Sequence, residues 1–252
     1  MNDPLPLAAL GVMMVRPGML IVTAPVFGGQ FVPAQVRIAL TAILGVILLP
    51  LVPVPAELAP LRLAALVTGE AVVGLALGFS IRALIAGAEL AGHVAGFQIG
   101  LSYAALVDPQ SGVRNNIVAL LYASLATIAF FGVNGHHVLL RALVRSYEWL
   151  PPGQWRLDSG GIAAVVTLLG LVFQLGTQLA MPVIVVLMLV ELVLGVVSRA
   201  APALNLMTAG FSIRVWVGLL VLAAGIAVVP DSITHWAPAA LAAASRLAGL
   251  GR

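Results

Sequence analysis

Apolar residues follow one another along most of this chain, in runs that leave no polar side on a helix. These runs cover residues 5–26, 36–49, 61–101, 116–131, 161–197 and 211–229, and segments rich in Pro, Gly or Asn separate them. A helix that is apolar all round is either buried in a large core or spans a membrane. The pattern therefore predicts an all-α, membrane-associated protein.

The lengths of the runs do not fit a set of simple membrane crossings. Residues 36–49 fall short of the roughly 20 residues that cross a hydrocarbon core, whereas residues 61–101 exceed that length. The longer run must therefore bend or project beyond the bilayer. Six apolar runs need not mean six crossings, and the scattered Arg residues do not assign an orientation.

Three places along the chain predict irregular helices. Arg16-Pro17-Gly18 predicts a weak point or kink in the first helix, and Pro182 predicts a kink in a long helix over residues 161–197, because proline lacks a backbone donor. Asn134, Gly135 and His136 predict a helix break ahead of a short amphipathic segment. The amino-terminal residues carry Asp3 and two prolines and resemble no cleavable signal.

Charged residues interrupt the apolar runs, although only 8% of the chain is charged and 62% is hydrophobic. Arg16, Glu70, Arg82 and Glu191 lie inside runs, and Arg199 lies where a helix is expected to end. Such residues need partners other than acyl chains. Two interpretations stay open: a proton relay or ion-coupling path, or ion pairs buried between helices or subunits. The second is the commoner arrangement, and we favour it.

Glycines recur at four-residue steps in the third run. Gly74 and Gly78 form one set, and Gly92, Gly96 and Gly100 form another. Residues four apart lie on one face of a helix, so each set predicts a face that a second backbone can approach closely. The alternative is that glycine is simply common in membrane helices.

Composition and motifs exclude several classes of function. The chain has no Cys, and its 12 basic residues are all Arg, scattered without a basic stripe, which argues against nucleic-acid binding. No metalloprotease, nucleophile-elbow or phosphate-loop motif occurs. His136 and His137 are adjacent and point to different helix faces, so a metal site is not expected. We therefore expect no enzyme activity and no cofactor.

The order of several short motifs resembles the FliR family, the export-gate subunits of flagellar and virulence type III secretion systems. The matching residues span almost the whole chain: Arg16-Pro17-Gly18, Pro25 to Gly28, Pro33 to Arg37, Glu70 with Gly74 and Gly78, Gly100-Leu101-Ser102 before Asp108-Pro109, Asn134-Gly135-His136, Ser146 before Leu150-Pro151, Pro182, Glu191 to Gly195, and Arg199 to Asn205.

The resemblance implies a subunit of a helical hetero-oligomer. A single domain over residues 1–252 would consist of a FliP-like part, 1–155, and a FliQ-like hairpin with a tail, 156–252. It implies FliP-like and FliQ-like partner subunits, an FlhB-like switch protein, other basal body components, and unfolded exported proteins as the cargo. The expected location is the bacterial inner membrane, within the flagellar basal body.

The resemblance also implies a loop that plugs the gate, at about residues 98–112. The residues assigned to it are Phe97, Gln98, Tyr103, Leu106, Val107, Asp108 and Pro109. Family members often carry phenylalanine in this loop, whereas this chain has Tyr103, Leu106 and Val107. Apolar side chains in a narrow pore resist wetting and hold back ions. Ordinary helix packing is the alternative for the same segment.

Two other functions remain as alternatives. One is a virulence-type gate subunit, called SctT in those systems, although the motif agreement favours a flagellar one. The other is a secondary transporter acting alone, with Glu70 or Glu191 as the coupling carboxylate. Transporters usually contain internal repeats with broken helices, and the two halves of this chain show no convincing repeat. The gate subunit is the prediction.

Overall fold

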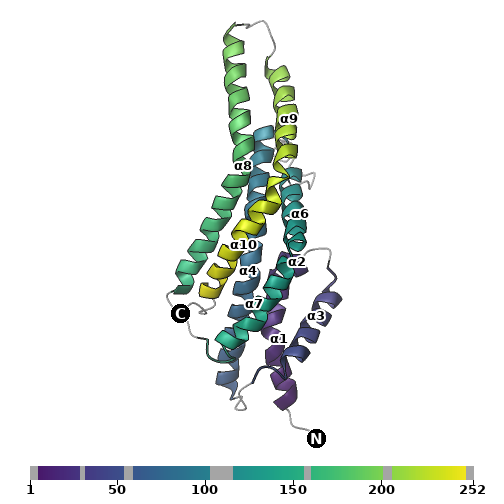
Figure 1. Cartoon of the computed structure of the whole chain (residues 1–252), viewed down its shortest axis with the longest axis vertical. Coiled ribbons are helices and arrows are strands. Elements are labelled where there is room, and N and C mark those ends of the chain that lie inside the picture. Colours follow the sequence, from purple (N-terminus) through teal and green to yellow (C-terminus); the bar gives the residue numbers. More distant parts are fainter. Residues whose placement is uncertain are drawn as a thin grey trace. The chain divides into compact units, whose positions relative to one another are not determined.

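A computed structural model describes residues 5–28, 32–53, 59–102, 116–155, 160–200 and 206–247, and these ranges contain helices and no strand (Figure 1). The all-α prediction is confirmed. The helices are α1 (Leu5–Thr23), α2 (Pro25–Gly28), α3 (Ala34–Leu48), α4 (Pro60–Ile99), α6 (Ile117–Gly132), α7 (Gly135–Trp149), α8 (Gly160–Ala200), α9 (Leu206–Gly225) and α10 (Val228–Leu247).

Two helices are far longer than a membrane span. Helix α4 has 40 residues and α8 has 41, which at 1.5 Å per residue is about 60 Å, against a hydrocarbon core of about 30 Å. Neither Pro17 in α1 nor Pro182 in α8 ends its helix. Helix α8 continues to Ala200, past the helix end expected at residue 197.

The number of helices that could cross a membrane is smaller than the number of apolar runs. Among the described residues, Pro60–Ile99 and Ala163–Ala200 qualify by length and composition, and up to four spans result if the bent pairs α6 with α7 and α9 with α10 each count as one. The most apolar window of α4 is 67% buried inside the chain, but that of α8 is only 17% buried. Helix α8 therefore exposes most of its apolar surface.

The chain divides into two compact units. Unit 1 comprises residues 1–83, 134–170 and 237–252, and unit 2 comprises residues 84–133 and 171–236. Helices α4, α8 and α10 therefore contribute residues to both units.

In unit 1, α3 packs against α1. A Cβ at Gly45 of α3 would lie 2.6 Å from Cγ of Met14, so glycine permits this approach. Met13, Leu20, Leu139 and Leu143 are at most 1% exposed and form part of the core.

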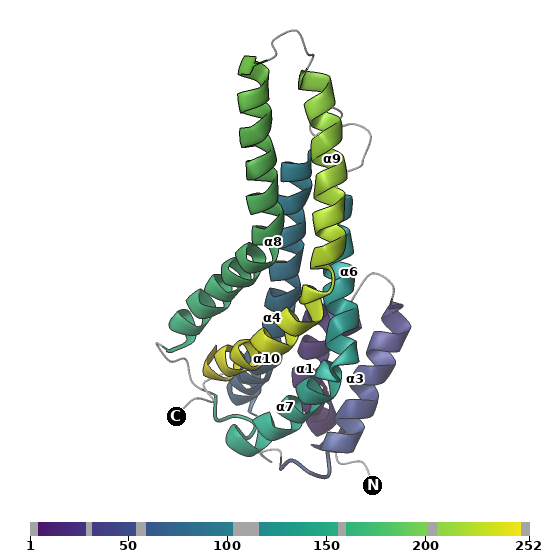
Figure 2. The ribbon, with the colours of Figure 1, turned by 45° about the horizontal axis from the view of Figure 1, so that its top comes forward.

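In unit 2, the later part of α8 and helix α9 run side by side in both views (Figures 1 and 2). The carboxyl-terminal part of α4 and helix α6 contribute Ile99 and Tyr122, which are at most 1% exposed. Large apolar residues of the α8 and α9 pair remain exposed, among them Phe173, Leu192 and Trp216, at 65%, 65% and 70%.

Candidate functional site

Arg16 on α1 is fully buried and is paired with Glu70 on α4. Its Nε donates to Oε2 of Glu70 at 2.8 Å, and its Nη2 donates to Oε1 at 2.9 Å. The two residues are 0% and 2% exposed. A guanidinium and a carboxylate joined by two parallel hydrogen bonds form the strongest type of ion pair in proteins. The pair holds α1 to α4.

The remaining hydrogen bonds of Arg16 reach the carboxyl-terminal end of α7. Nη1 donates to Oγ of Ser146 at 2.9 Å, and Nη2 also donates to the carbonyl of Leu150 at 3.0 Å. Leu150 is the C-cap of α7, where carbonyls lack intrahelical partners. The Cζ of Arg16 lies 3.9 Å from the ring centroid of Tyr147. One side chain thus joins three helices of unit 1.

Arg16, Glu70, Ser146, Tyr147 and Leu150 form the Arg16 cluster, and the hydrogen bonds already made by Glu70 limit the chemistry that this cluster can perform. Both of its carboxylate oxygens accept hydrogen bonds from Arg16, and burial of the pair excludes bulk water. The coupling carboxylate of a transporter must instead be accessible to water or to an ion pathway, so that it can bind and release a proton or an ion. The geometry therefore favours the ion-pair interpretation of Glu70. Loss of either partner would leave an uncompensated buried charge.

Glycines of α4 bring it close to α1 beside this cluster. A Cβ at Gly74 would collide with the backbone carbonyl oxygen of Arg16, and one at Gly78 would lie 2.8 Å from the carbonyl oxygen of Leu20. These contacts are with backbone atoms, which cannot rotate away. Both glycines therefore lie at a close helix contact.

The second glycine set faces α6 in unit 2. A Cβ at Gly92 would lie 2.7 Å from the carbonyl oxygen of Val118, and one at Gly96 would collide with the side chain of Asn116. Gly100 differs, because it lies beyond α4 with a φ of 96°. That backbone conformation favours glycine, so Gly100 ends the helix instead of extending the packing face.

Arg82 is not buried within this chain. It is exposed on α4, and no partner for it occurs in the described part of the chain. Leu75 and Phe79, at i−7 and i−3, are 36% and 37% exposed and lie on the same helix face. The expected burial of Arg82 between helices or subunits is not met within this chain, and cover by a neighbouring subunit stays a prediction.

Glu191 and Arg199 lie on the exposed surface of α8. Glu191 pairs with Arg214 of α9 at 3.1 Å, and the two side chains are 44% and 30% exposed. Expected burial of Glu191 is therefore not seen within the chain, but the pair links the two helices. Arg199 lies in the last turn of α8, where a cation complements the helix dipole.

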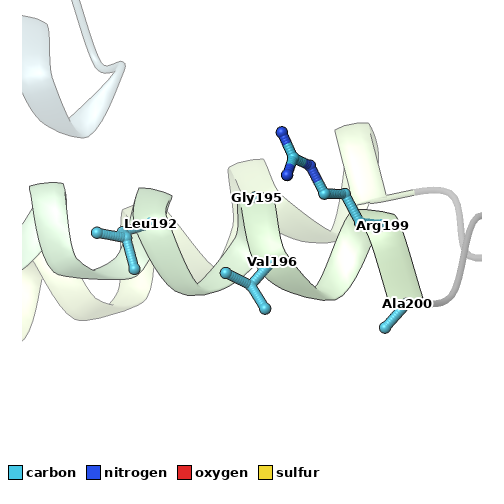
Figure 3. Close-up of a pocket in the computed structure, with 5 residues that line it drawn as sticks. All are labelled: Leu192, Gly195, Val196, Arg199 and Ala200. Carbon is cyan, nitrogen blue, oxygen red and sulfur yellow. The ribbon is translucent and has the colours of Figure 1, made fainter.

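An open hollow of about 650 Å³ lies at this end of α8, lined by Leu192, Gly195, Val196, Arg199 and Ala200. Figure 3 shows the guanidinium of Arg199 turned back along the helix toward Gly195. A Cβ at Gly195 would meet nothing within 4 Å. The hollow is apolar with one cation and carries no catalytic group.

The predicted plug lies partly outside the described residues. Phe97, 52% exposed, and Gln98 lie in the last turn of α4. Tyr103, Leu106, Val107, Asp108 and Pro109 belong to residues 103–115, which lie outside the described ranges. Their contacts therefore stay a prediction.

The predicted helix break occurs where the sequence placed it. Asn134 separates α6 from α7 with a φ of 58°, and α7 begins at Gly135. His136 and His137 lie inside α7, with ring centroids 4.2 Å apart. No group of three metal-ligating side chains occurs among the described residues.

Sequence reasoning missed two residues of these contacts. Arg214 is a lone charge in the run of residues 211–229, and that isolation was a signal that it would pair with Glu191 across a hairpin. The second is Asn116, which the sequence analysis identified only as the first residue of the run 116–131. Nothing in the sequence indicated that its side chain would reach α4.

Comparison with known proteins identifies relatives along most of the chain. The sequence profile of the bacterial export proteins, family 1, matches residues 7–238. The flagellar biosynthetic protein FliR of Escherichia coli K12 is 33% identical over 220 residues, which is 86% of this chain and 83% of that protein. FliR of Bacillus subtilis is 31% identical over 82% of both chains. The secretion system apparatus protein SsaT of Salmonella typhimurium is 25% identical over 68% of this chain and 65% of that protein.

Proposed function

The chain belongs to the bacterial export proteins, family 1, and from this premise we propose that it is a core subunit of a flagellar type III protein export gate. The match to residues 7–238, with flagellar relatives at 31–33% identity over most of their length, carries the proposal. Membership makes the chain a membrane-embedded component of an export apparatus and not an enzyme. Its cargo would be unfolded exported proteins.

The flagellar assignment is favoured over a virulence system by the relatives themselves. The FliR proteins of Escherichia coli and Bacillus subtilis are 33% and 31% identical over 86% and 82% of this chain, whereas the secretion system apparatus protein SsaT is 25% identical over 68% of it. The location proposed is accordingly the inner membrane, within the flagellar basal body.

Exposed apolar surface supports a role inside a larger assembly. Helix α8 has a mean hydropathy of 2.7 in a window that is only 17% buried. The partly exposed ion pair between Glu191 of α8 and Arg214 of α9 lies on these apolar helices. Charged side chains facing acyl chains are costly, whereas a protein neighbour can supply hydrogen bonds. FliP-like and FliQ-like subunits are the partners that we propose, with an FlhB-like switch protein nearby.

The internal organisation follows from the same proposal. Residues 1–155 form the FliP-like part, which contains the Arg16 and Glu70 pair, and residues 156–252 form the FliQ-like hairpin and tail. Within the assembly, the segment from Phe97 to Pro109 would plug the pore. Exposure of Phe97 at the end of α4 supports this placement, because it leaves an aromatic side chain without cover inside the chain.

Co-purification tests the proposal directly. The chain would be expressed with a tag, alone and together with the FliP-like and FliQ-like subunits encoded in the same genome, and the products compared on native gels. A gate subunit should yield a stable complex only with both partners. A stable monomer or homo-oligomer that ignores both partners would contradict the proposal and favour a transporter acting alone.

A further inference from the structure

A narrow stripe along α4 in unit 1 is exposed, although most of the helix around it is buried. Five residues form this α4 stripe: Thr68, Val72, Leu75, Phe79 and Arg82. Val72 is half-buried and the other four are exposed, with Leu75 and Phe79 at 36% and 37%. Between residues 73 and 81, every position except these last two is buried.

Other parts of unit 1 cover α4 on both sides of the stripe. Successive residues of an α-helix are turned by about 100°, so Gly78 lies on one side of the stripe and Gly69 on the other. A Cβ at Gly78 would lie 2.8 Å from the carbonyl oxygen of Leu20 in α1, and one at Gly69 would lie 2.8 Å from Cβ of Trp155. The exposed part of α4 is therefore a line of single side chains.

The spacing of the stripe fits a second helix. Its residues follow one another at steps of 4, 3, 4 and 3 residues, an average of 3.5. Side chains that repeat at this interval form the line along which two helices pack and coil around each other. A helix that faces lipid is instead apolar over a broad surface. One further helix would cover Leu75 and Phe79 completely.

Arg82 determines the chemistry that this further helix needs. It makes no hydrogen bond or ion pair in the described part of the chain. It is 22 residues from Pro60 and 17 from Ile99, so the nearer end of α4 is about 26 Å away and cannot offer its free carbonyls. A guanidinium beside apolar side chains is costly against acyl chains. A carboxylate can satisfy it with two hydrogen bonds.

We propose that the α4 stripe is the contact surface for one helix of a neighbouring subunit, and that this helix carries an Asp or Glu opposite Arg82. The inference rests on the proposed function, because the export gate supplies the neighbouring subunit. It adds to that function the face of the chain that is covered and the charge of the group that covers it.

Substitutions of Arg82 test the charge. Each variant is expressed with the FliP-like and FliQ-like subunits, and the yield of the complex is measured on native gels. Arg82→Leu leaves the neighbour's carboxylate unpaired, and Arg82→Glu sets a second carboxylate against it. Both should lower the yield at least about tenfold, because loss of one partner of a desolvated charge pair changes an association equilibrium by more than this factor. Arg82→Lys keeps the charge without the fork geometry and should lower the yield less.

Two measurements show that the effect belongs to the contact. Thermal unfolding of the subunit alone in detergent should be unchanged in all three variants, since Arg82 has no partner among the described residues. Arg141→Glu is the matched control, because Arg141 is also exposed and unpaired in the described ranges but lies on the amphipathic helix α7. An equal loss of yield in this control would assign the effect to net charge and overturn the inference.

The yields also separate this inference from the proposed function. If the parent chain assembles with its partners and Arg82→Leu assembles as well as the parent, lipid or water covers the stripe and only this inference is overturned. If the parent chain itself forms no complex with either partner, the proposed function is overturned and this inference with it.

Cross-linking identifies the helix that lies on the stripe. A photoreactive amino acid in place of Phe79 should link the assembled chain to one partner subunit, at a segment with an Asp or Glu within about one helical turn of the linked residue, because residues 79 and 82 lie about one turn apart. Exchange of the charges, Arg82→Glu with that acidic residue changed to Arg, should restore most of the yield lost in Arg82→Glu alone. Cross-links to lipid alone, a linked segment without a carboxylate, or an exchange that restores nothing would each contradict the proposal.

Discussion

The guanidinium of Arg16 and the carboxylate of Glu70 are joined by hydrogen bonds of 2.8 and 2.9 Å although 54 residues separate them in the chain. The pair is buried between α1 and α4 and is completed by Ser146 and the carbonyl of Leu150. A buried pair is stable only when nearly all its donors and acceptors are satisfied. The position of one arginine thus determines how three helices meet.

Removal of one partner of this pair should be much worse than removal of both. Glu70→Ala leaves Arg16 buried and unpaired, so we expect a loss of about 3–5 kcal/mol in unfolding free energy. Arg16→Met with Glu70→Leu should recover most of it. Thermal unfolding in detergent measures both.

Glu89→Ala is the matched control on the same helix. The Glu89 carboxylate lies 3.9 Å from His93, and both side chains are more than 40% exposed, so we expect a change below about 1 kcal/mol. A Glu70→Ala variant as stable as this control would show that the buried pair contributes nothing.

Tyr147 should act through its ring and not through its hydroxyl. The ring lies 3.9 Å from the guanidinium carbon of Arg16, while the hydroxyl has no hydrogen-bond partner among the described residues. Tyr147→Phe should therefore be neutral or slightly stabilising, and Tyr147→Leu should cost about 1–2 kcal/mol of unfolding free energy. Equal losses in both variants would assign the effect to the hydroxyl.

The sequence predicted the helices better than the contacts between them. Continuous apolar runs define helices in lipid or in a protein core, so α3, α4, α6 and α8 lie close to the expected ranges. The pairing of Arg16 with Glu70 depends on which helix faces which, and one sequence does not specify that. The sequence likewise did not indicate that Arg82 lies on an exposed face of α4, since an apolar run does not reveal which of its sides the chain itself covers.

Glycine spacing carried more information than isolated charges. Gly74 and Gly78 face α1, while Gly92 and Gly96 face α6, as one-sided spacing suggested. Gly100 continues the same four-residue step but ends the helix. Spacing identifies a face, and only the position of the helix end distinguishes packing from termination.

Substitution of Gly74 should therefore be costly where substitution of Gly11 is not. Gly74→Ala places a methyl group against the backbone of α1, and we expect a loss of about 1–3 kcal/mol in unfolding free energy. Gly11 lies in α1 with nothing within 4 Å of a Cβ, so Gly11→Ala should be neutral or stabilising by up to about 1 kcal/mol. Thermal unfolding compares the two, and equal effects would deny a close contact at Gly74.

Glu191→Ala should weaken assembly more than it changes conductance. Within the chain the pair with Arg214 is partly exposed and is worth at most about 1 kcal/mol. A partner subunit that covers it would remove water and make the pair more important. Native-gel yield of the complex is the measurement. Exchange of the charges, Glu191→Arg with Arg214→Glu, is the control and should restore part of the yield. A Glu191→Ala variant that assembles normally but no longer exports would contradict an assembly role and favour a transport role for Glu191.

Deletion of residues 103–107 should open the gate to small ions without preventing its assembly. The deletion removes Tyr103, Leu106 and Val107, the apolar side chains assigned to the plug, and a pore without them wets more readily. The Arg16 cluster and the α8 and α9 pair are untouched, so native-gel yield should match the parent. Conductance across membranes that contain the assembled complex is the measurement, with Gly11→Ala as a control outside the pore segment. A deletion variant as tight as the parent would show that the seal lies elsewhere in the assembly, because these side chains then cannot be what holds back ions.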